Sequence, residues 1–349
     1  MKGVLRVVTI KDVAEKAGVS ASTVSRALSG NTPVDETTKK RVMQAVQELN
    51  YRPNELARGL KVGKTKTIGL VMPNVRNLMF PAAIQGITDV ARQHGSTVIL
   101  CNTDEDLETE MAQIDSLHQR RVDGLIFSTA TSDSDHILEL KESGFPVTLL
   151  IRHMGEDVDA VIVDNFTGGY DGTQLLLSRG FRRIALINGT LKLDLYQQRY
   201  EGYRQALTDA EVPIIPDLIH HERSGWMDGY YSMLSILESN VLPDAVFATS
   251  DPKALGVIKA IKEKGLKVPE DISVLGYDNL ETSQLMDPPL TTVAQPFYEL
   301  GQTAAKRLFK LINSKRRLKP KVEKLPIKLV LRDSVAEASG ASDLIASDK

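Results

Sequence analysis

Near the start of the chain, one arginine follows a run of small hydroxyl side chains. Residues 20–28 read Ser-Ala-Ser-Thr-Val-Ser-Arg-Ala-Leu, with Arg26 near the end of the run. An arginine guanidinium can donate two parallel hydrogen bonds to a guanine base, which is worth about 1–3 kcal/mol of discrimination between bases. These side chains could therefore read a DNA sequence, provided that the elements carrying them enter a groove.

The surrounding pattern predicts two short helices joined at Gly18. Thr9 can cap the first helix, with Asp12 three residues later as an imperfect capping box, and Ser20 can cap the second. Apolar residues recur on one face of each predicted helix: Ile10, Val13, Ala14 and Ala17, then Val24 and Leu28. Two helices around a tight glycine turn form either an ordinary helical hairpin or a helix-turn-helix, whose second helix enters the DNA major groove.

The uneven distribution of charge favours the helix-turn-helix. The 349 residues include 43 Lys and Arg and 45 Asp and Glu, for a net charge of -2. Residues 1–64 contain 12 basic and 6 acidic residues, so they carry +6, while the remainder carries -8. A basic N-terminal module on an acidic body is typical of a small DNA-binding domain joined to a part that need not touch DNA.

A third helix, predicted over residues 36–49 and capped by Asp35, would close a three-helix core. In the segment that follows, residues 51–61, any helix is too short to be stable alone in water. The segment is therefore a linker, or an element that orders only when it is braced. Leu60 lies between basic residues there, and an apolar side chain flanked by cations is what insertion into the minor groove requires.

Residues 9–28, Tyr51-Arg-Pro-Asn and Ala57-Arg-Gly-Leu resemble the DNA-binding domain and hinge helix of the LacI family of bacterial repressors. The resemblance implies contacts with base edges by Ala21, Ser22 and Arg26, and contacts with phosphates by Thr9, Ser20, Thr23 and Ser25. It also implies that Leu60 inserts between base pairs, with Ala57 beside it. Because Ala21 and Ser22 are short, Arg26 and groove shape are expected to supply a larger share of the specificity.

From Thr67 onward, short runs rich in Val and Ile alternate with longer amphipathic stretches. Apolar strands that alternate with helices predict parallel sheets covered by helices on both faces. The strands are expected at residues 67–72, 97–101, 124–128, 147–151, 160–163, 184–188, 245–249, 272–275 and 327–331. The main helices are expected at residues 79–94, 105–119, 166–179, 197–210, 252–264 and 296–312.

This pattern divides into two halves near Asp164, and over residues 66–333 it resembles the periplasmic-binding-protein-like core of the same family. The expected fold is a small all-α helix-turn-helix headpiece plus an α/β body of two Rossmann-like parallel-sheet subdomains, periplasmic-binding-protein-like type I. The expected boundaries are 1–52 for the headpiece, 53–65 for the hinge helix and linker, 66–164 with 296–323 for the first subdomain, 165–295 with 324–333 for the second, and 334–349 for a disordered tail.

Polar residues near the predicted strand ends could bind a small molecule, because the carboxyl ends of parallel strands surround such sites. Asp164, Asp251 and Asp278 lie there, although each could instead cap a helix. A lone arginine early in a helix, such as Arg199, is usually solvated, but the resemblance implies that Arg199 and Asp278 contact a ligand. It implies further effector contacts at Phe80, Asp164, Asp251, Gln295 and Phe297. An arginine and carboxylates around aromatic side chains suit a sugar or sugar derivative.

Three features depart from the family pattern or stand outside it. Trp226, the only tryptophan, lies about two positions after the aromatic residue of several relatives, and either stacks on the ligand or packs on the following helix. Arg152 and His153 follow a strand and could meet an acidic ligand. His220 and His221 are adjacent, so their side chains should point to opposite faces of a strand, and no metal is predicted.

The sequence contains no glycine-rich dinucleotide fingerprint, phosphate loop, nucleophile elbow or Cys/His metal cluster, so no catalytic site or cofactor is predicted. No apolar run approaches the roughly 18 residues of a membrane span, and residues 1–8 are too short for a signal peptide, so a cytoplasmic protein is expected. The single cysteine, Cys101, is expected in a buried strand. We therefore predict a homodimeric transcriptional repressor with two partners, operator DNA and a small sugar-like effector; the alternatives are a sugar-transport protein or an enzyme.

Overall fold

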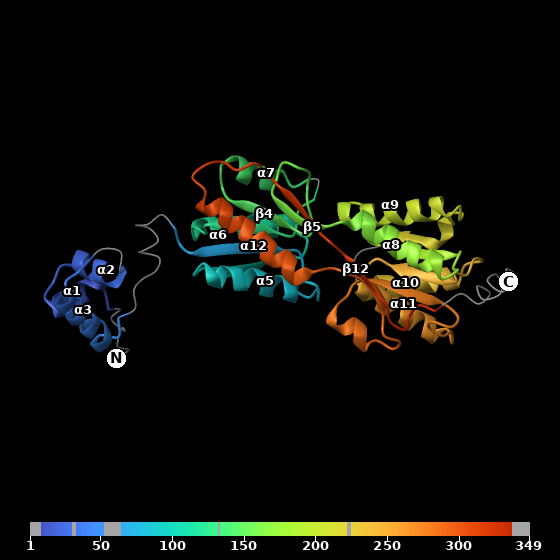
Figure 1. Cartoon of the computed structure of the whole chain (residues 1–349), viewed down its shortest axis with the longest axis horizontal. Helices are drawn as coiled ribbons and strands as arrows, with labels where there is room; N and C mark the ends of the chain where they lie inside the picture. The colour runs from blue at the N-terminus through green and yellow to red at the C-terminus, as the bar shows by residue number, and fades with distance from the viewer. Residues whose placement is uncertain (1–7, 30–32, 52–63, 132, 222–224, 337–349) are drawn as a thin grey trace, which may run out of the picture. The chain divides into compact units, whose positions relative to one another are not determined.

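The computed structural model describes residues 8–29, 33–51, 64–131, 133–221 and 225–336. The chain forms two compact units, Met1–Thr65, here called the headpiece, and Lys66–Lys349, here called the body (Figure 1). Within the described ranges, no helix is both long and apolar enough to cross a membrane.

The described part of the headpiece contains three helices: α1 (Ile10–Ala17), α2 (Ala21–Ser29) and α3 (Glu36–Glu48). The Asp12 carboxylate accepts a hydrogen bond from the Thr9 backbone N–H at 2.7 Å, and the Ser20 hydroxyl accepts one from the Thr23 N–H at 3.2 Å. Gly18 ends α1 in the left-handed conformation, with φ at +64°. These contacts confirm the predicted start of each of the first two helices and the turn between them.

The three helices share a small apolar core. Val13, Val24 and Val42, one from each helix, are fully buried at its centre. The third helix begins as predicted, because the Asp35 side chain accepts a hydrogen bond from the Thr38 N–H at 3.0 Å. This arrangement leaves the opposite side of α2 available to solvent.

The body contains two six-stranded sheets, and the first is parallel throughout its recorded pairings. Its order is β11-β5-β4-β3-β1-β2. Its strands are β1 (Thr67–Met72), β2 (Thr97–Asn102), β3 (Gly124–Phe127), β4 (Val147–Leu150), β5 (Ala160–Val163) and β11 (Val322–Leu325). Successive residues of a strand point to opposite faces, so Leu70 joins the core beneath α5 (Phe80–Gln93) and α12 (Phe297–Asn313), while Val71 joins the core beneath α6 (Leu107–Gln119) and α7 (Asp135–Glu142).

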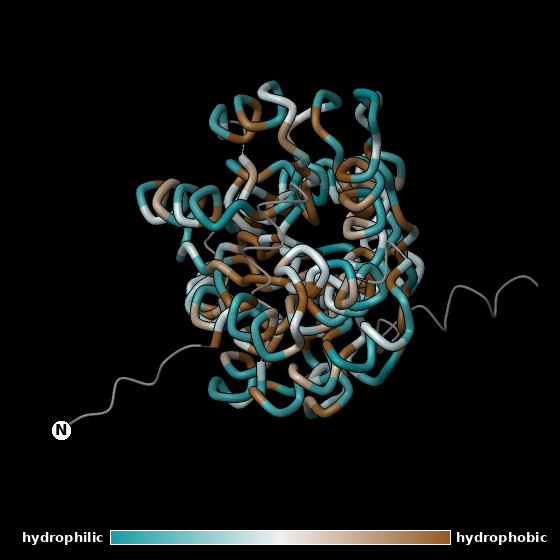
Figure 2. Tube along the Cα trace, turned by 90° about the vertical axis from the view of Figure 1, so that its left-hand side faces the viewer, coloured by the Kyte–Doolittle hydropathy of each residue, from teal (hydrophilic) through white to brown (hydrophobic). Residues whose placement is uncertain are grey.

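The second sheet repeats the topology with the order β12-β10-β9-β8-β6-β7, and only β12 is antiparallel to its neighbour. Its strands are β6 (Ile184–Asn188), β7 (Ile219–His221), β8 (Ala245–Ala248), β9 (Ser273–Asp278), β10 (Thr291–Ala294) and β12 (Lys328–Val330). One face is covered by α8 (Asn165–Ser178) and α9 (Asp194–Asp209), and the other by α10 (Trp226–Leu237) and α11 (Asp251–Glu263) (Figure 1). Figure 2 shows hydrophilic and hydrophobic residues alternating along the helical turns of the chain, as expected for helices with one buried face.

Three strands were not predicted, and each lacks a continuous apolar run. They are β7, which contains the two histidines, β10, which begins with two threonines, and β11, whose sequence is Val-Glu-Lys-Leu. The predicted strand 272–275 instead runs to Asp278. Because β11 pairs with β5 as far as Leu325, the chain stays with the first sheet slightly beyond the predicted boundary at 323/324.

The prediction that the disordered tail begins at residue 334 is wrong for Ser334. Its side chain is fully buried, donates a hydrogen bond to the Val274 carbonyl at 2.6 Å and accepts one from the Thr291 N–H at 2.8 Å. A small hydroxyl residue in a polar segment is typical of a disordered tail, but the Ser334 hydroxyl forms hydrogen bonds with backbone groups of β9 and β10. Cys101 is buried in β2 as predicted, and burial raises the pKa of its thiol.

Candidate functional site

The predicted DNA-contacting residues of α2 form an exposed polar surface. Ser20, Ser22 and Arg26 are exposed, and the Arg26 side chain returns to its own helix, where Nε donates to the Ser22 carbonyl at 3.4 Å. The Ser20 hydroxyl also lies 2.8 Å from that of Ser22 and 2.9 Å from that of Thr23. The other predicted contacts in this part of the headpiece are the exposed Thr9 and the partly exposed Ala21 and Ser25. Ala57 and Leu60 lie outside the described residues.

The predicted ligand-binding arginine of the body is not solvated but buried. Arg199, on α9, is 3% exposed. Its Nε donates to the Asn165 Oδ1 at 2.9 Å, and its Nη1 donates to the Thr249 carbonyl at 2.7 Å. The guanidinium carbon lies 3.6 Å from the centroid of the Tyr277 ring, which adds a cation–π contact. The strand ends of the second sheet therefore hold a fixed positive charge.

Asp278 and Gln295 are brought together as a pair. Asp278 is the last residue of β9, and its Oδ1 accepts a hydrogen bond from the Gln295 Nε2 at 2.7 Å. Burial, together with the nearby charge of Asp251, raises the pKa of Asp278 to about 7, although the charge of Arg199 opposes the rise. Asp278 also has a φ of +122°, which is uncommon for a residue with a side chain, so its backbone is strained. A strained, buried carboxyl that titrates near neutrality is a feature of functional sites.

Asp251 neither caps its helix nor remains open to a ligand. It is the first residue of α11, fully buried, and burial raises the pKa of its carboxyl. The carboxylate accepts hydrogen bonds from the Leu280 N–H at 2.9 Å, from the Thr292 hydroxyl at 2.6 Å and from the Ser283 hydroxyl. These donors lie on the segment after β9 and on β10, so Asp251 positions that segment around Asp278. The sequence also allowed Asp251 to cap α11, but the N-cap position of this helix is Ser250.

Asp164 is a helix cap, the second of the two roles predicted for it. Its Oδ1 accepts a hydrogen bond from the Thr167 N–H at 3.0 Å at the start of α8. The side chain is partly exposed, so this bond leaves its other oxygen available to a ligand.

Aromatic side chains from both halves of the body meet in one apolar cluster. Phe80 and Phe297 begin α5 and α12 of the first half, and Tyr196 comes from α9 of the second half. All three are buried, with exposed fractions of 2%, 6% and 7%. The Tyr196 ring lies 5.4 Å from the Arg199 guanidinium, which joins the apolar cluster to the polar one. Arg199, Phe80, Phe297 and Tyr196 thus lie around a common junction between the halves.

The other residues considered in the sequence have different surroundings. The Arg152 guanidinium is held by Glu105 through two hydrogen bonds of 2.6 and 3.1 Å, so it is already paired with a carboxylate. His153 Nδ1 lies 3.2 Å from the Asp194 carboxylate and links the two halves. Trp226 begins α10 and is 46% exposed, so it is not buried as the junction residues are.

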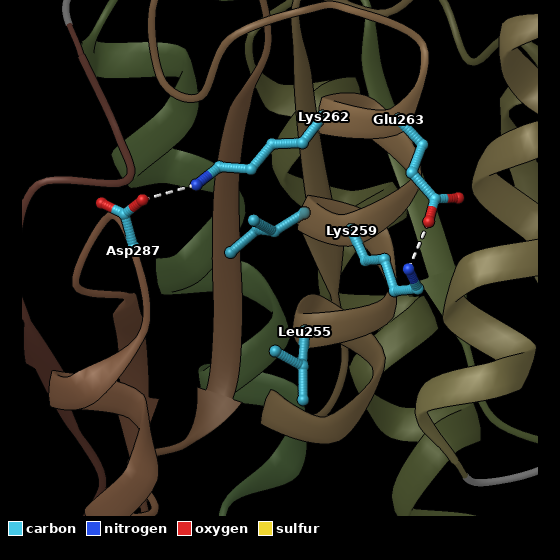
Figure 3. A pocket seen from close by; sticks show the side chains of 6 residues that line it. Leu255, Lys259, Lys262, Glu263 and Asp287 are labelled. Carbon is cyan, nitrogen blue, oxygen red and sulfur yellow. Dashed lines mark hydrogen bonds and ion pairs between the residues drawn. The ribbon is translucent and has the colours of Figure 1, made fainter.

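The His221 ring packs edge-on against Tyr200, and no group of three metal-binding side chains occurs among the described residues. A surface pocket lies along the exposed side of α11, and none of the predicted site residues lines it (Figure 3). Its edges carry two ion pairs, Lys262 with Asp287 at 2.7 Å and Lys259 with Glu263. Because its cations are already paired, this pocket is a weaker candidate than the junction.

Sequence reasoning missed four residues of the junction: Asn165, Thr249, Tyr277 and Lys253. Each lies beside a residue that was predicted, or within two positions of one. Lys253 had the clearest signal, because it shares one helical face with Val257 and Ile261, both fully buried. A lysine on the apolar face of a helix can therefore indicate a site residue, as an aspartate at a strand end does.

Comparison with known proteins identifies the family. Residues 9–54 match the model of bacterial regulatory proteins of the lacI family, and residues 65–333 match the model of periplasmic binding proteins and the sugar binding domain of the LacI family. The chain is 40% identical over 329 residues to the HTH-type transcriptional repressor PurR of Histophilus somni (strain 129Pt), covering 94% of this chain and 98% of PurR.

Two solved structures are similar over nearly the whole chain. The lac repressor dimer bound to operator and the anti-inducer ONPF has a TM-score of 0.87 at 31% identity, covering 95% of this chain and 100% of that one. The complex of the transcriptional regulator CelR with cellobiose has a TM-score of 0.73 at 29% identity, covering 94% and 99%. The chain therefore belongs to the LacI family of bacterial regulatory proteins and is a DNA-binding transcriptional regulator with a ligand-binding effector domain.

Proposed function

We propose that the chain acts as a homodimeric repressor and that a small sugar-like effector, bound at the junction of the two halves of the body, controls its binding to operator DNA. One observation carries the proposal: Arg199, Asp278 and Gln295 are buried together beside aromatic residues from both halves. Guanidinium, carboxyl and amide groups pair with ligand hydroxyls, and apolar side chains enclose the rest of a small ligand. CelR, a relative of similar fold, binds cellobiose.

On the DNA side, we assign α2 to the major groove. Ser22 and Arg26 are four residues apart and exposed, so they lie on one face of the helix. We assign base-edge contacts to Ala21, Ser22 and Arg26, and phosphate contacts to Thr9, Ser20, Thr23 and Ser25. Ala57 and Leu60 remain predicted minor-groove contacts. A symmetric operator read by two headpieces requires a two-fold dimer, and the proposal places the protein with its DNA in the bacterial cytoplasm.

Coupling between the two sites would arise from the packing of the halves. The effector contacts we assign come from both halves: Phe80 and Phe297 from the first, and Asp164, Arg199, Trp226, Asp278 and Gln295 from the second. Asp251, whose carboxylate is occupied, is assigned a positioning role and no contact with the ligand. A ligand between them changes the free energy of closing the halves, and His153 with Asp194 is one pair that such a motion must rearrange. The effector can shift operator affinity only by its differential affinity for the two arrangements.

Operator selection tests the proposal without knowledge of the ligand. The purified full chain is used to enrich a random DNA library, and the affinity for the enriched sequence is compared with that for random duplex at several salt concentrations. A regulator should prefer its operator by roughly 10³-fold or more, with both affinities falling as salt rises. Failure to enrich any sequence would contradict the repressor function.

A further inference from the structure

One lysine at the junction of the two halves has no acceptor for its three donors. Lys253 is the third residue of α11, and its side chain is 0% exposed. Among the described residues, no atom accepts a hydrogen bond from its Nζ. An ammonium buried without an acceptor is costly, so a partner from outside the protein would fit the position.

Two contacts place this amine at the proposed effector site rather than elsewhere in the core. Lys253 Nζ lies 5.1 Å from the centroid of the Tyr196 ring, and the Arg199 guanidinium lies 5.4 Å from the same centroid. The charge of Lys253 also acts on Asp278, where it lowers the pKa of the carboxyl. Tyr196 in turn belongs to the apolar cluster that joins the halves. Lys253 is thus flanked by the residues that we assign to effector binding.

Among the described residues, the nearby carboxylates accept hydrogen bonds from groups other than this amine. Asp251 is occupied by three donors from the segment after β9 and from β10, and Asp278 accepts from Gln295. The exposed lysines of the same helix differ in this respect, because Lys259 and Lys262 each have a carboxylate partner (Figure 3). The helix therefore carries paired lysines on its exposed side and one unpaired lysine at the junction.

We propose that the effector carries an anionic group, the carboxylate of a sugar acid or the phosphate of a sugar phosphate, and that Lys253 binds this group. The inference rests on the proposed effector site and narrows its ligand class from sugars in general to acidic sugars. A charge-assisted hydrogen bond from a buried lysine is stronger than one between neutral groups, so an acidic ligand should be favoured over its neutral counterpart. Arg199 lies beside the same ring and adds a second positive charge to the site.

Matched pairs of probes test the proposal by calorimetric titration of the full chain. The pairs are glucose with glucuronate, galactose with galacturonate, glucose with glucose 6-phosphate, and ribose with ribose 5-phosphate. In at least one pair the acidic member should bind about tenfold or more tightly than the neutral one, equivalent to about 1.4 kcal/mol. Whether a uronate or a phosphate is preferred identifies the source of the anion.

The variant Lys253→Met should abolish the preference. Methionine has a similar length and removes a buried charge, so the melting temperature without ligand should not fall, and folding is checked in that way. The acidic probe should lose about tenfold in affinity while the neutral probe is unchanged. Lys259→Met on the exposed side of the same helix is the matched control and should keep the preference.

Three results would overturn the proposal. They are equal binding of acidic and neutral members, an unchanged preference in Lys253→Met, and no binding by any probe. Equal binding overturns both the acidic ligand class and the role of Lys253, but it leaves the proposal of a sugar effector in place. If no probe binds, the acidic-sugar ligand is wrong, and the operator selection, which needs no ligand, decides separately whether the repressor function stands.

Discussion

The headpiece and the body hold their functional side chains in opposite ways. In the headpiece, Arg26 is exposed, and its Nε donates a hydrogen bond to the Ser22 carbonyl, four residues earlier in the same helix. In the body, Arg199 is buried and bonds to Asn165 and Thr249, 34 and 50 residues away in sequence. The headpiece therefore presents its side chains on a helix that is stable without them, whereas in the body the same groups that would bind the effector also hold the second half together.

This contrast predicts that substitutions in the two units separate stability from binding. A change on the exposed face of α2 should alter DNA binding alone. A change in the buried cluster should lower stability and ligand binding together.

Arg199→Met should have the largest effect. It leaves the Asn165 side chain and the Thr249 carbonyl without their donor and removes a charge that opposes the negative charge of Asp278. Breaking a buried charged network of this kind costs about 3–5 kcal/mol. Urea unfolding measures the loss, and effector binding should disappear with it. Arg204→Met, at an exposed position of the same helix, is the control. Equal stability of the two variants would show that Arg199 is not structural.

Asp278→Asn should change the pH dependence of stability. Because the pKa of Asp278 is raised to about 7, the folded state favours the protonated carboxyl, and its contribution is complete below the ordinary value near 4. That contribution is lost as the pH rises from about 4 to about 7. The charged neighbours Asp251, Arg199 and Lys253 are the same in the variant. The melting temperature of Asp278→Asn relative to the wild type should therefore rise across this range by several degrees; parallel curves would contradict the assignment.

Arg26→Ala tests the other side of the contrast. Loss of a bidentate base contact should weaken operator binding by about 1–3 kcal/mol. The melting temperature should not change, because the side chain is exposed. Fluorescence anisotropy with the selected operator and with random duplex measures both affinities. If affinity for random duplex falls equally, Arg26 contacts phosphate rather than a base.

Gly18→Ala should have a smaller effect, confined to the headpiece. Gly18 has a φ of +64°, and a Cβ there would meet only the Arg41 guanidinium at an ordinary 3.8 Å. The cost is therefore backbone strain alone, about 1–2 kcal/mol. Hydrogen exchange of α1 and α2 should accelerate while that of the body stays constant. Gly18→Asn, which tolerates the left-handed region better, should lose less.

Local chemistry explains why the three helices in the described part of the headpiece could be predicted from the sequence. Each of these helices begins at a side chain that caps a backbone N–H within three residues, so the caps Ser20 and Asp35 can be recognised from the sequence alone. The strands of the body that consist of continuous apolar runs could also be predicted from the sequence. The exceptions, β7, β10 and β11, depend on neighbours that the sequence does not reveal locally.

The junction was only partly predictable for the same reason. Family resemblance pointed to Arg199, Asp278 and Gln295, but the partners of Arg199 are set by tertiary packing. Asp251 shows the limit most clearly, because a carboxylate at a helix start suggests a cap, and only the folded chain shows that it holds the segment after β9. Lys253 shares an apolar helical face with Val257 and Ile261, which indicates burial, but only the packing of α11 shows that its amine lies at the junction.

Operator binding with and without ligand tests the central claim most directly. The affinity for the selected operator is measured by anisotropy in the absence and presence of a saturating sugar that raises the melting temperature of the full chain. If the junction controls the headpiece, the ligand should change operator affinity about 5- to 150-fold in the wild type and leave it unchanged in Asp278→Asn. A ligand that binds the body without altering operator affinity would contradict the account.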